Sequence, residues 1–552
     1  MSMEKRILIA FVLSAIIFAI WSIIFPPPKP VRTKVVETAV TTAASTVDET
    51  GVMEEGSVET AAVAGTQSLL GATGGGQALV VKMSNDVMDI AFNTQGASIE
   101  SLVLKRFDDV AGEPLNLVQS VEHPERTHPL QMVIDGSPDT RVYEAVETNG
   151  LLTFTWADGE GRSIIKTVSI DQGYGLNVSV EVQGVGPESV MSLGTGMRDT
   201  GPVERANRFA TWGDATVVTV EDKEDYRREK VDGSVSVQGT GLRFTGFEDT
   251  YFLSVFRAEE GVSKVVINKL SLTETDDKGE VVDLPVLRVD IVSSSGLFKG
   301  ELFSAPKEFD LLQKEGGGLE ETLHFGIFHP IAVFFLKVLR WIFGYVGNWG
   351  WAIVLLTVAI RMALFPLMHK STVSMRRMQK VQPKVKAIQE KYKKNKTDPQ
   401  VRQKMNQETM ALYKEEGVNP VGGCLPMLVQ MPILFALYTL FAHAIELRHA
   451  PFIWWITDLS AKDPIYITPV LMTATMWLQQ RLAPQAGDPN QMRMMRMMPL
   501  VFGIMFLGFP AGLVLYWLTN NVVSILQQEV TLHLVGERKR PGGGRRQAKG
   551  KK

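Results

Sequence analysis

The chain has 552 residues, 45% of them hydrophobic, with a net charge of −3 and a single cysteine, Cys424. This length exceeds that of one ordinary domain, and one cysteine excludes an intrachain disulfide. The small net charge averages two unlike parts: residues 26–323 carry 26 Lys and Arg against 48 Asp and Glu, whereas residues 370–416 carry 13 against 5. Because basic loops stay on the cytoplasmic side of a membrane, this asymmetry predicts a chain divided between two compartments.

The first element is an apolar segment at residues 7–25, which follows Lys5 and Arg6 and ends at three prolines. A signal peptide has a shorter apolar core and a small-x-small cleavage site, which we do not find here. We therefore favour an uncleaved transmembrane anchor over residues 1–25, with its N-terminus inside. Residues 26–77 are rich in Ala, Thr, Val, Glu and Gly without periodicity, which predicts a flexible linker.

Residues 78–323 are predicted to form an all-β domain. Residues 176–182 alternate between apolar and polar side chains, the period-two pattern of a half-buried strand. Turn formers such as Asp158-Gly159 separate runs of this kind, which is typical of an antiparallel β-sandwich. Further strands are predicted at residues 79–83, 87–92, 151–156, 163–170, 264–272 and 286–292. Since the anchor starts inside, this acidic domain is expected outside the membrane. It carries no P-loop, H-E-x-x-H or G-x-S-x-G motif, so we predict no catalytic, cofactor-binding or metal residue in it.

Two helices follow the β domain. Residues 324–346 are predicted to form an amphipathic helix in the outer membrane interface, with Pro330 in its first turn. Residues 347–369 are predicted to cross the membrane, because the twenty apolar positions 349–368 span about 30 Å. Arg361 lies inside this run, where a charge costs at least about 2.5–3.5 kcal/mol, and arginine does not escape by losing its proton. It either marks a polar intramembrane cavity or extends toward the head groups.

Residues 370–417 are predicted to form a basic helical hairpin in the cytoplasm. Its tip is at residues 393–396, and Asp398 and Pro399 open its second helix. A solvated connector would explain such a hairpin. We favour a docking surface for anionic partners or lipid, because its excess of positive charge exceeds what solubility requires.

Residues 418–536 are predicted to supply four more spans. The first two are residues 421–445 and 465–482. Residues 494–528 would make a helix of about 52 Å, too long for one crossing. The segment 508–512, Gly-Phe-Pro-Ala-Gly, therefore indicates a hairpin of two spans. Six crossings in total return the basic tail, residues 537–552, to the cytoplasm.

The last predicted span carries a set of polar residues that can face Arg361 if the two helices adjoin. They are Thr519, Asn520, Asn521, Ser524, Gln527 and Gln528. Such residues commonly join helices to one another, and this alternative stays open. As a set we favour a polar cavity, because the only acidic residues in the spans, Glu446 and Glu529, lie at span ends.

Several segments resemble the signature of the YidC/Oxa1/Alb3 membrane protein insertases. They are residues 419–426 (NPVGGCLP), 430–433 (QMPI), 446–448 (ELR), 455–459 (WITDL) and 509–517 (FPAGLVLYW). The plan of six spans, five of them in the core, with a large first outer domain resembles the Gram-negative YidC type. The resemblance implies a β-supersandwich fold for the periplasmic domain. It also implies that Arg361 is the groove arginine, with Thr357 and either Tyr516 or Trp517 at functionally sensitive positions.

These observations together predict an insertase rather than an enzyme. A groove open to cytoplasm and lipid would receive a nascent segment, with Arg361 attracting its carboxylates and Thr357, Gln430, Asn520 and Gln527 replacing lost water hydrogen bonds. Apolar residues on two spans would let the passenger helix slide into lipid: Met427, Met431, Leu434, Phe435, Phe502 and Phe506. The methionines at residues 492–498 suit varied contacts, although ordinary packing explains them as well.

The expected location is the bacterial inner membrane, with both termini in the cytoplasm and the large domain in the periplasm. Expected partners are nascent inner-membrane proteins, the ribosome through the basic hairpin and tail, the Sec translocon with its accessory subunits, and anionic phospholipids. No DNA and no cofactor are expected. The main alternative is a secondary transporter with a cationic site at mid-membrane, although we find no internal repeat. A membrane-tethered periplasmic enzyme is a second alternative.

Overall fold

A computed structural model describes residues 67–68, 78–109, 111–120, 123–200, 202–205, 210–275, 281–392, 398–418, 425–482 and 489–534. The predicted anchor at residues 1–25, the basic tail at 537–552 and the hairpin tip at 393–396 lie outside these residues, as does most of the predicted linker at 26–77.

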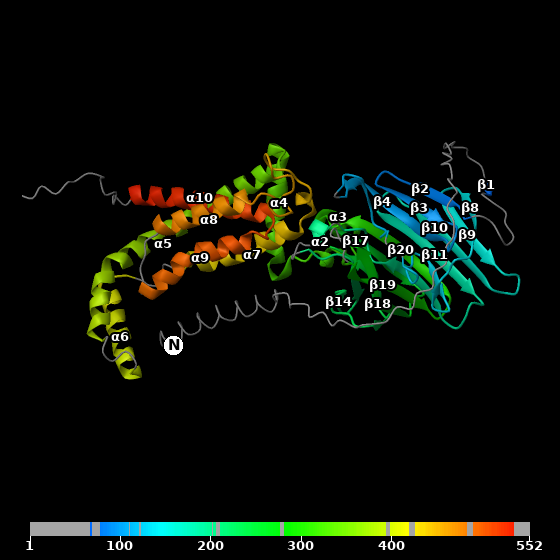
Figure 1. The fold of residues 1–552 in the computed structure, drawn as a ribbon, viewed down its shortest axis with the longest axis horizontal. Coiled ribbons are helices and arrows are strands. Elements are labelled where there is room, and N and C mark those ends of the chain that lie inside the picture. The colour runs from blue at the N-terminus through cyan, green and yellow to red at the C-terminus, as the bar shows by residue number, and fades with distance from the viewer. Residues whose placement is uncertain are drawn as a thin grey trace, which may run out of the picture. The chain divides into compact units, whose positions relative to one another are not determined.

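The first part of the described chain is an all-β domain of three antiparallel sheets (Figure 1). The ten-stranded sheet has the order β1 (Gln67–Ser68), β8 (Glu144–Thr148), β9 (Leu151–Ala157), β10 (Ser163–Ile170), β11 (Gly175–Gln183), β20 (Leu297–Pro306), β17 (Phe252–Glu260), β16 (Leu242–Glu248), β13 (Asp214–Thr219) and β14 (Lys223–Tyr226). The six-stranded sheet has the order β15 (Ser234–Gln238), β18 (Lys264–Thr275), β19 (Val281–Ser293), β12 (Ser189–Thr195), β6 (Met132–Ile134) and β7 (Ser137–Pro138). The four-stranded sheet has the order β2 (Val80–Ser84), β3 (Met88–Asn93), β4 (Ser98–Asp108) and β5 (Pro114–Asn116).

The predicted period-two pattern is confirmed in β11. Leu176, Val178 and Val180 are buried, and Val178 lies opposite Val168 of β10. Alternate residues of a strand point to one face, so this register directs one apolar row into the core. The sequence does not predict β1, which falls in the expected linker and pairs antiparallel with β8.

Helices make up the rest of the described chain. They are α2 (Pro202–Arg205), α3 (Phe309–Glu315), α4 (His329–Val346), α5 (Trp349–Lys391), α6 (Pro399–Glu415), α7 (Leu425–His443), α8 (Ile467–Leu482), α9 (Pro489–Phe506) and α10 (Ala511–Leu534), with short 3₁₀ turns at Leu319–Thr322, Gly326–Phe328 and Ile445–Leu447. By length and composition, two helical segments of the described residues are apolar and long enough to cross a membrane, Gly326–Val346 and Trp349–Lys391.

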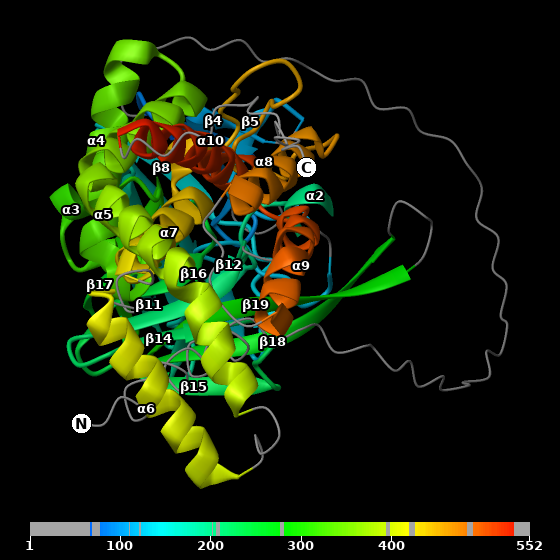
Figure 2. The ribbon, with the colours of Figure 1, turned by 90° about the vertical axis from the view of Figure 1, so that its left-hand side faces the viewer.

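The predicted boundary between residues 369 and 370 lies inside one helix, because α5 continues unbroken from the apolar segment into the basic one. Its 43 residues give a helix of about 65 Å, and Pro366 and Pro383 lie within it. The hairpin itself forms from the end of α5 and α6 (Figure 2), which share a small apolar cluster of Val381, Val385 and Val418. Asp398 caps α6 as predicted, its carboxylate accepting from the backbone N–H of Gln400 at 2.9 Å.

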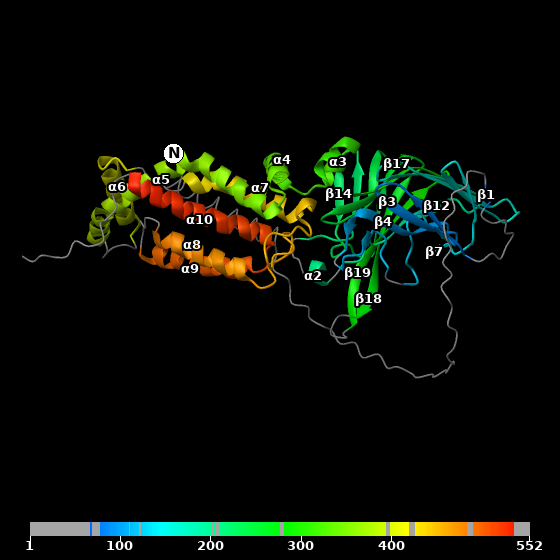
Figure 3. The same ribbon diagram turned by 90° about the horizontal axis from the view of Figure 1, so that it is seen from above.

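Helix α10 is the centre of the helical region. It packs along α5 on one side and along α8 on another, α9 packs against α8, and α7 packs mainly against α4 (Figure 3). The predicted break between the last two spans is confirmed, since α9 ends at Phe506 and α10 begins at Ala511. The loop before α8 caps α10: the N–H groups of Ala511 and Gly512 donate to the carbonyls of Ala461 (2.7 Å) and Leu459 (2.9 Å).

Candidate functional site

Arg361 is a buried cation on α5 with 4% of its surface exposed. Its Nε donates to the side-chain oxygen of Asn520 on α10. Its Nη1 is buried and has no hydrogen-bond partner, and among the described residues no carboxylate lies within ion-pair distance of the guanidinium. Burying a cation without a counter-charge costs free energy, so an external anion that reached Arg361 would be attracted to it.

The polar residues of α10 divide between two neighbouring helices. Asn520 and Gln527 face α5: the Gln527 amide donates to the backbone carbonyl of Arg361 at 2.8 Å. Asn521 and Gln528 face α8, where Gln528 donates to the carbonyl of Leu482 at the end of that helix. Each pair is seven residues apart, so its members lie on one stripe of the helix. The first stripe contacts the Arg361 helix, and the second bonds to α8.

Tyr516 and Gln430 form a second polar contact, between α10 and α7. The Gln430 amide nitrogen donates to the Tyr516 hydroxyl at 2.7 Å, while its amide oxygen is buried without a partner. Tyr516 is 1% exposed. Trp517 points instead to α9, where its ring lies 6.2 Å from that of Phe502 and 5.1 Å from that of Phe506. The two neighbouring aromatic residues therefore face different helices.

Thr357 lies one turn before Arg361 on α5 and is also buried. Its hydroxyl donates to the carbonyl of Ile353 in the same helix at 2.7 Å. This bond uses the hydroxyl proton and leaves the oxygen as an acceptor. Together, Thr357, Arg361, Gln430, Tyr516, Asn520 and Gln527 are called the polar cluster below.

The residues predicted to form a sliding surface lie on two helices, α7 and α9. Met431, Leu434 and Phe435 are half-buried on α7, and Phe435 stacks on Phe328 with ring centres 5.9 Å apart. On α9, Phe502 is half-buried. Phe506 is buried against Phe509, so its side chain packs inside the protein rather than on a sliding surface. The side chain of Met427 lies outside the described part of the chain.

A cavity of about 210 Å³ adjoins the polar cluster between α5, α8 and α10. Gln527 belongs to both. Its lining also includes apolar residues such as Phe365 and Met368, the predicted polar residues Ser524 and Gln528, and polar residues not predicted from the sequence, among them His369, Thr372, Gln479 and Thr531. His369 and Thr372 lie two and three helical turns beyond Arg361 on the same continuous helix. An unbroken α5 would have placed them on one face with it.

Two family models together match most of the chain: "YidC periplasmic domain" over residues 80–338 and "60Kd inner membrane protein" over residues 341–537. The chain is 37% identical to the membrane protein insertase YidC of Geobacter sulfurreducens, over 95% of this chain and 98% of that one. It is 35% identical to the membrane protein insertase YidC of Syntrophus aciditrophicus, over 95% and 99%. The chain belongs to the YidC family of membrane protein insertases.

A solved structure of an active YidC insertase with its first transmembrane domain resolved also matches, at 19% identity and a TM-score of 0.36, over 82% of this chain and 92% of that one. The resemblance stated from the signature segments is thus confirmed by the family models and by the full-length relatives. In this YidC-family chain the all-β part corresponds to the family's periplasmic domain.

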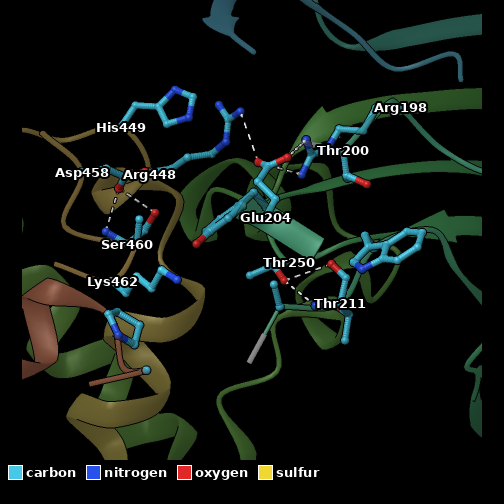
Figure 4. Close-up of a pocket in the computed structure, with 16 residues that line it drawn as sticks. Arg198, Thr200, Glu204, Thr211, Thr250, Arg448, His449, Asp458, Ser460 and Lys462 are labelled. Atoms are coloured by element: carbon cyan, nitrogen blue, oxygen red, sulfur yellow. Dashed lines mark hydrogen bonds and ion pairs between the residues drawn. The ribbon is translucent and has the colours of Figure 1, made fainter. Parts of the chain in front are cut away.

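Figure 4 shows a further cavity, of about 180 Å³, where the periplasmic domain meets the loop between α7 and α8. Arg198 donates to Asp249 at 2.5 Å and to Glu204 at 2.9 Å, and Arg448 of the loop donates to the carbonyl of Asp108 at 2.8 Å. Burial alone would lower the pKa of Arg198, but its two carboxylate partners outweigh this and raise it. Arg448, which belongs to one of the family signature segments, also takes part in this ion-pair network, 3.8 Å from Glu204.

One group of potential metal ligands lies in the periplasmic domain. Ligand atoms of Asp225, Glu248 and His324 lie within 4.8 Å of one another. The ammonium of Lys307 is 2.8 Å from Glu248 and also donates to the carbonyl of Thr322 at 3.1 Å. Burial would raise the pKa of Glu248, but Lys307 and His324 hold it well below its usual range. The lysine therefore already supplies the positive charge that the buried carboxylate requires.

Proposed function

We propose that this chain is a membrane protein insertase that receives a hydrophobic segment with its polar flank at the polar cluster and releases the segment into the inner membrane. The observation that carries this proposal is Arg361, a buried cation with an unused Nη1 and no carboxylate partner in the described chain. A purely structural arginine would be expected to have one. The relatives of this chain in the YidC family are named membrane protein insertases, which supports the same function here.

The physical task is to move polar residues past hydrocarbon. Each unsatisfied polar group costs several kcal/mol there, so an unassisted polar flank crosses slowly. Arg361 would attract carboxylates of that flank in surroundings drier than water, where the attraction is stronger. The partnerless oxygen of Gln430 and the acceptor oxygen of Thr357 would receive donors from the passenger backbone.

The cavity beside the cluster supports access from the cytoplasmic end. It is lined by α5, α8 and α10, includes Gln527 and lies further along α5 toward its basic half. The passenger would then leave past the apolar residues of α7 and α9. Transfer of its apolar surface into lipid and the membrane potential would drive the step without nucleotide.

The same proposal includes the orientation in the membrane. Six spans would leave both termini and the hairpin of α5 and α6 in the cytoplasm, with the β domain in the periplasm. The hairpin and the basic tail would contact ribosomes or anionic lipid, and the chain would work alone or beside the Sec translocon.

A secondary transporter is the alternative that shares a cation at mid-membrane. The single stripe of Asn520 and Gln527 does not favour it, since a transport site is built from two broken helices, and the described α5 and α10 are both continuous. Solute flux into proteoliposomes that contain the purified chain would distinguish the two functions.

The direct test is insertion of a short-tailed inner-membrane substrate, followed by protease protection of its tail. We expect depletion of the protein in cells to block insertion, and the purified chain in liposomes to restore it without ATP or GTP. A matched preparation with Arg361→Ala should insert the substrate more slowly. Unchanged insertion after depletion would overturn the proposed function.

A further inference from the structure

A groove of about 600 Å³ runs between α8 and α9, away from the polar cluster. Its walls are almost wholly apolar and include Val470, Ala474, Trp477, Leu500, Ile504 and Leu507. Several of these side chains are open to the surroundings, Ile504 at 65% and Val470 at 61%. The polar cluster and its cavity do not use this surface.

The length of the groove matches one leaflet of a bilayer. Along α9 it extends from Arg496 to Leu507, a rise of about 16 Å, or roughly half of the 30 Å hydrocarbon thickness. Near its middle the two helices approach closely at Gly503, where an added Cβ would lie 2.3 Å from the hydroxyl of Thr473. Gly503 therefore allows α8 and α9 to approach each other at the bottom of the groove.

Two arginines lie at one end of the groove. Arg496 is part of its wall, and the guanidinium of Arg481 lies 3.6 Å from the ring centre of Trp477, which also lines it. The Gln480 side chain donates to the carbonyl of Met495, which brings the end of α8 beside the arginine of α9. In the described part of the chain neither arginine has a carboxylate partner.

We propose that the α8–α9 groove binds one anionic phospholipid of the cytoplasmic leaflet, its acyl chain between the helices and its phosphate beside Arg481 and Arg496. This inference rests on the proposed membrane orientation, which places that end of both helices at the cytoplasmic surface. Basic pockets between membrane helices on this side suit anionic head groups, and the cytoplasmic leaflet supplies such lipids.

A second copy of the chain fits the same surface less well. A two-fold contact sets each patch against itself. Four guanidinium groups would then meet at one depth, and like charges repel. An acyl chain with a phosphate complements both the apolar walls and the charged end.

The test measures lipid retention by the full chain, independently of insertion. Protein is reconstituted into nanodiscs of equal phosphatidylglycerol and phosphatidylcholine, released, and its bound lipid is identified by native mass spectrometry. Arg481→Gln and Arg496→Gln should each lower the ratio of bound phosphatidylglycerol to phosphatidylcholine about fivefold, and together about 25-fold. Ala474→Trp, which fills the groove, should lower retention of both lipids.

The matched control is Arg402→Gln, an exposed arginine on α6 of the hairpin. It should leave the ratio unchanged. An unchanged ratio in the double variant, or an equal loss in the control, would overturn the lipid site. So would a dimer that Ala474→Trp dissociates, which would assign the groove to a second copy. If lipid selectivity fails while insertion persists, only this inference is lost.

Discussion

The charge of Arg361 should couple to the charge of the passenger, and replacing it by methionine removes that charge while keeping an apolar side chain of similar length. At 4 Å, two unit charges attract by about 1 kcal/mol in water and about 4 kcal/mol at the effective dielectric constant of 20 that suits partly buried sites. Arg361 is 4% exposed and lies among amides and hydroxyls, so the second value applies better. The difference, about 3 kcal/mol, corresponds to about a hundredfold in rate.

The assay is a double-mutant cycle on protease protection of the inserted tail. Two passengers differ only by Asp or Asn in a short tail, and each is tested with the wild type, Arg361→Met and Arg361→Lys. We expect Arg361→Met to slow the Asp passenger by up to about a hundredfold and the Asn passenger far less. Arg361→Lys should restore most of the difference, because lysine keeps the charge but not the planar fork.

The control for this cycle is Lys337→Met, which removes an exposed cation from α4. It should slow neither passenger. Equal slowing of the Asp and Asn passengers by Arg361→Met would refute the electrostatic role and leave Arg361 as a structural residue.

Four further outcomes follow from particular contacts. Tyr516→Phe removes the hydroxyl that Gln430 donates to and should slow insertion about fivefold, from about 1 kcal/mol per hydrogen bond, whereas Trp517→Phe keeps its ring contacts and should change the rate less than twofold in the same assay. Lys307→Met removes the nearer of the two lysines paired with buried Glu248 and should lower the unfolding free energy by about 3 kcal/mol in urea titrations. Burial raises the pKa of Glu248, but Lys307 and His324 hold it low. The wild type should therefore lose stability as the pH falls below about 4.3, and the Lys307→Met variant should lose less stability over the same range. Gly350→Ala places a Cβ against the ring of Phe452, in the loop after α7. This clash should lower the free energy of unfolding by about 1–3 kcal/mol, measured by thermal unfolding.

The strands with clear period-two alternation and the break before the last helix could be predicted because their signals are local, whereas strands such as β12, β17 and β20 were not predicted. Period-two alternation predicts β10 and β11 wherever their neighbours lie, and Gly508 and Pro510 between α9 and α10 are local signals that end a helix. The end of α5 could not be predicted in the same way. Membrane thickness limits the apolar length of a helix, but it does not require the helix to stop there, and two prolines are tolerated inside this one.

The site was predictable as a set of residue types but not as a set of contacts. Composition and spacing identify Arg361 and the polar residues of α10. They do not tell which of these residues face α5 and which face α8, because that depends on helix neighbours far away in sequence. The contact between Arg448 and Asp108 has the same character: 340 residues separate its partners.

The division of α10 explains how the buried Arg361 persists without a counter-charge among the described residues. Asn521 and Gln528 bond to α8, including its last turn of carbonyls, and the loop before α8 caps the first turn of α10. These contacts are complete within the chain and hold the helix in place. On the neighbouring stripe, Asn520 gives Arg361 one bond and leaves Nη1 without a partner. A carboxylate in place of Asn520 would lower the free-energy cost of burying Arg361, but it would also form an ion pair with the guanidinium and leave it unavailable to a passenger. Helix α10 thus has its hydrogen bonds made toward α8, while Nη1 of Arg361 beside it has none. A transient polar passenger requires such a site, because each hydrogen bond that it forms there is one that the resting chain lacks.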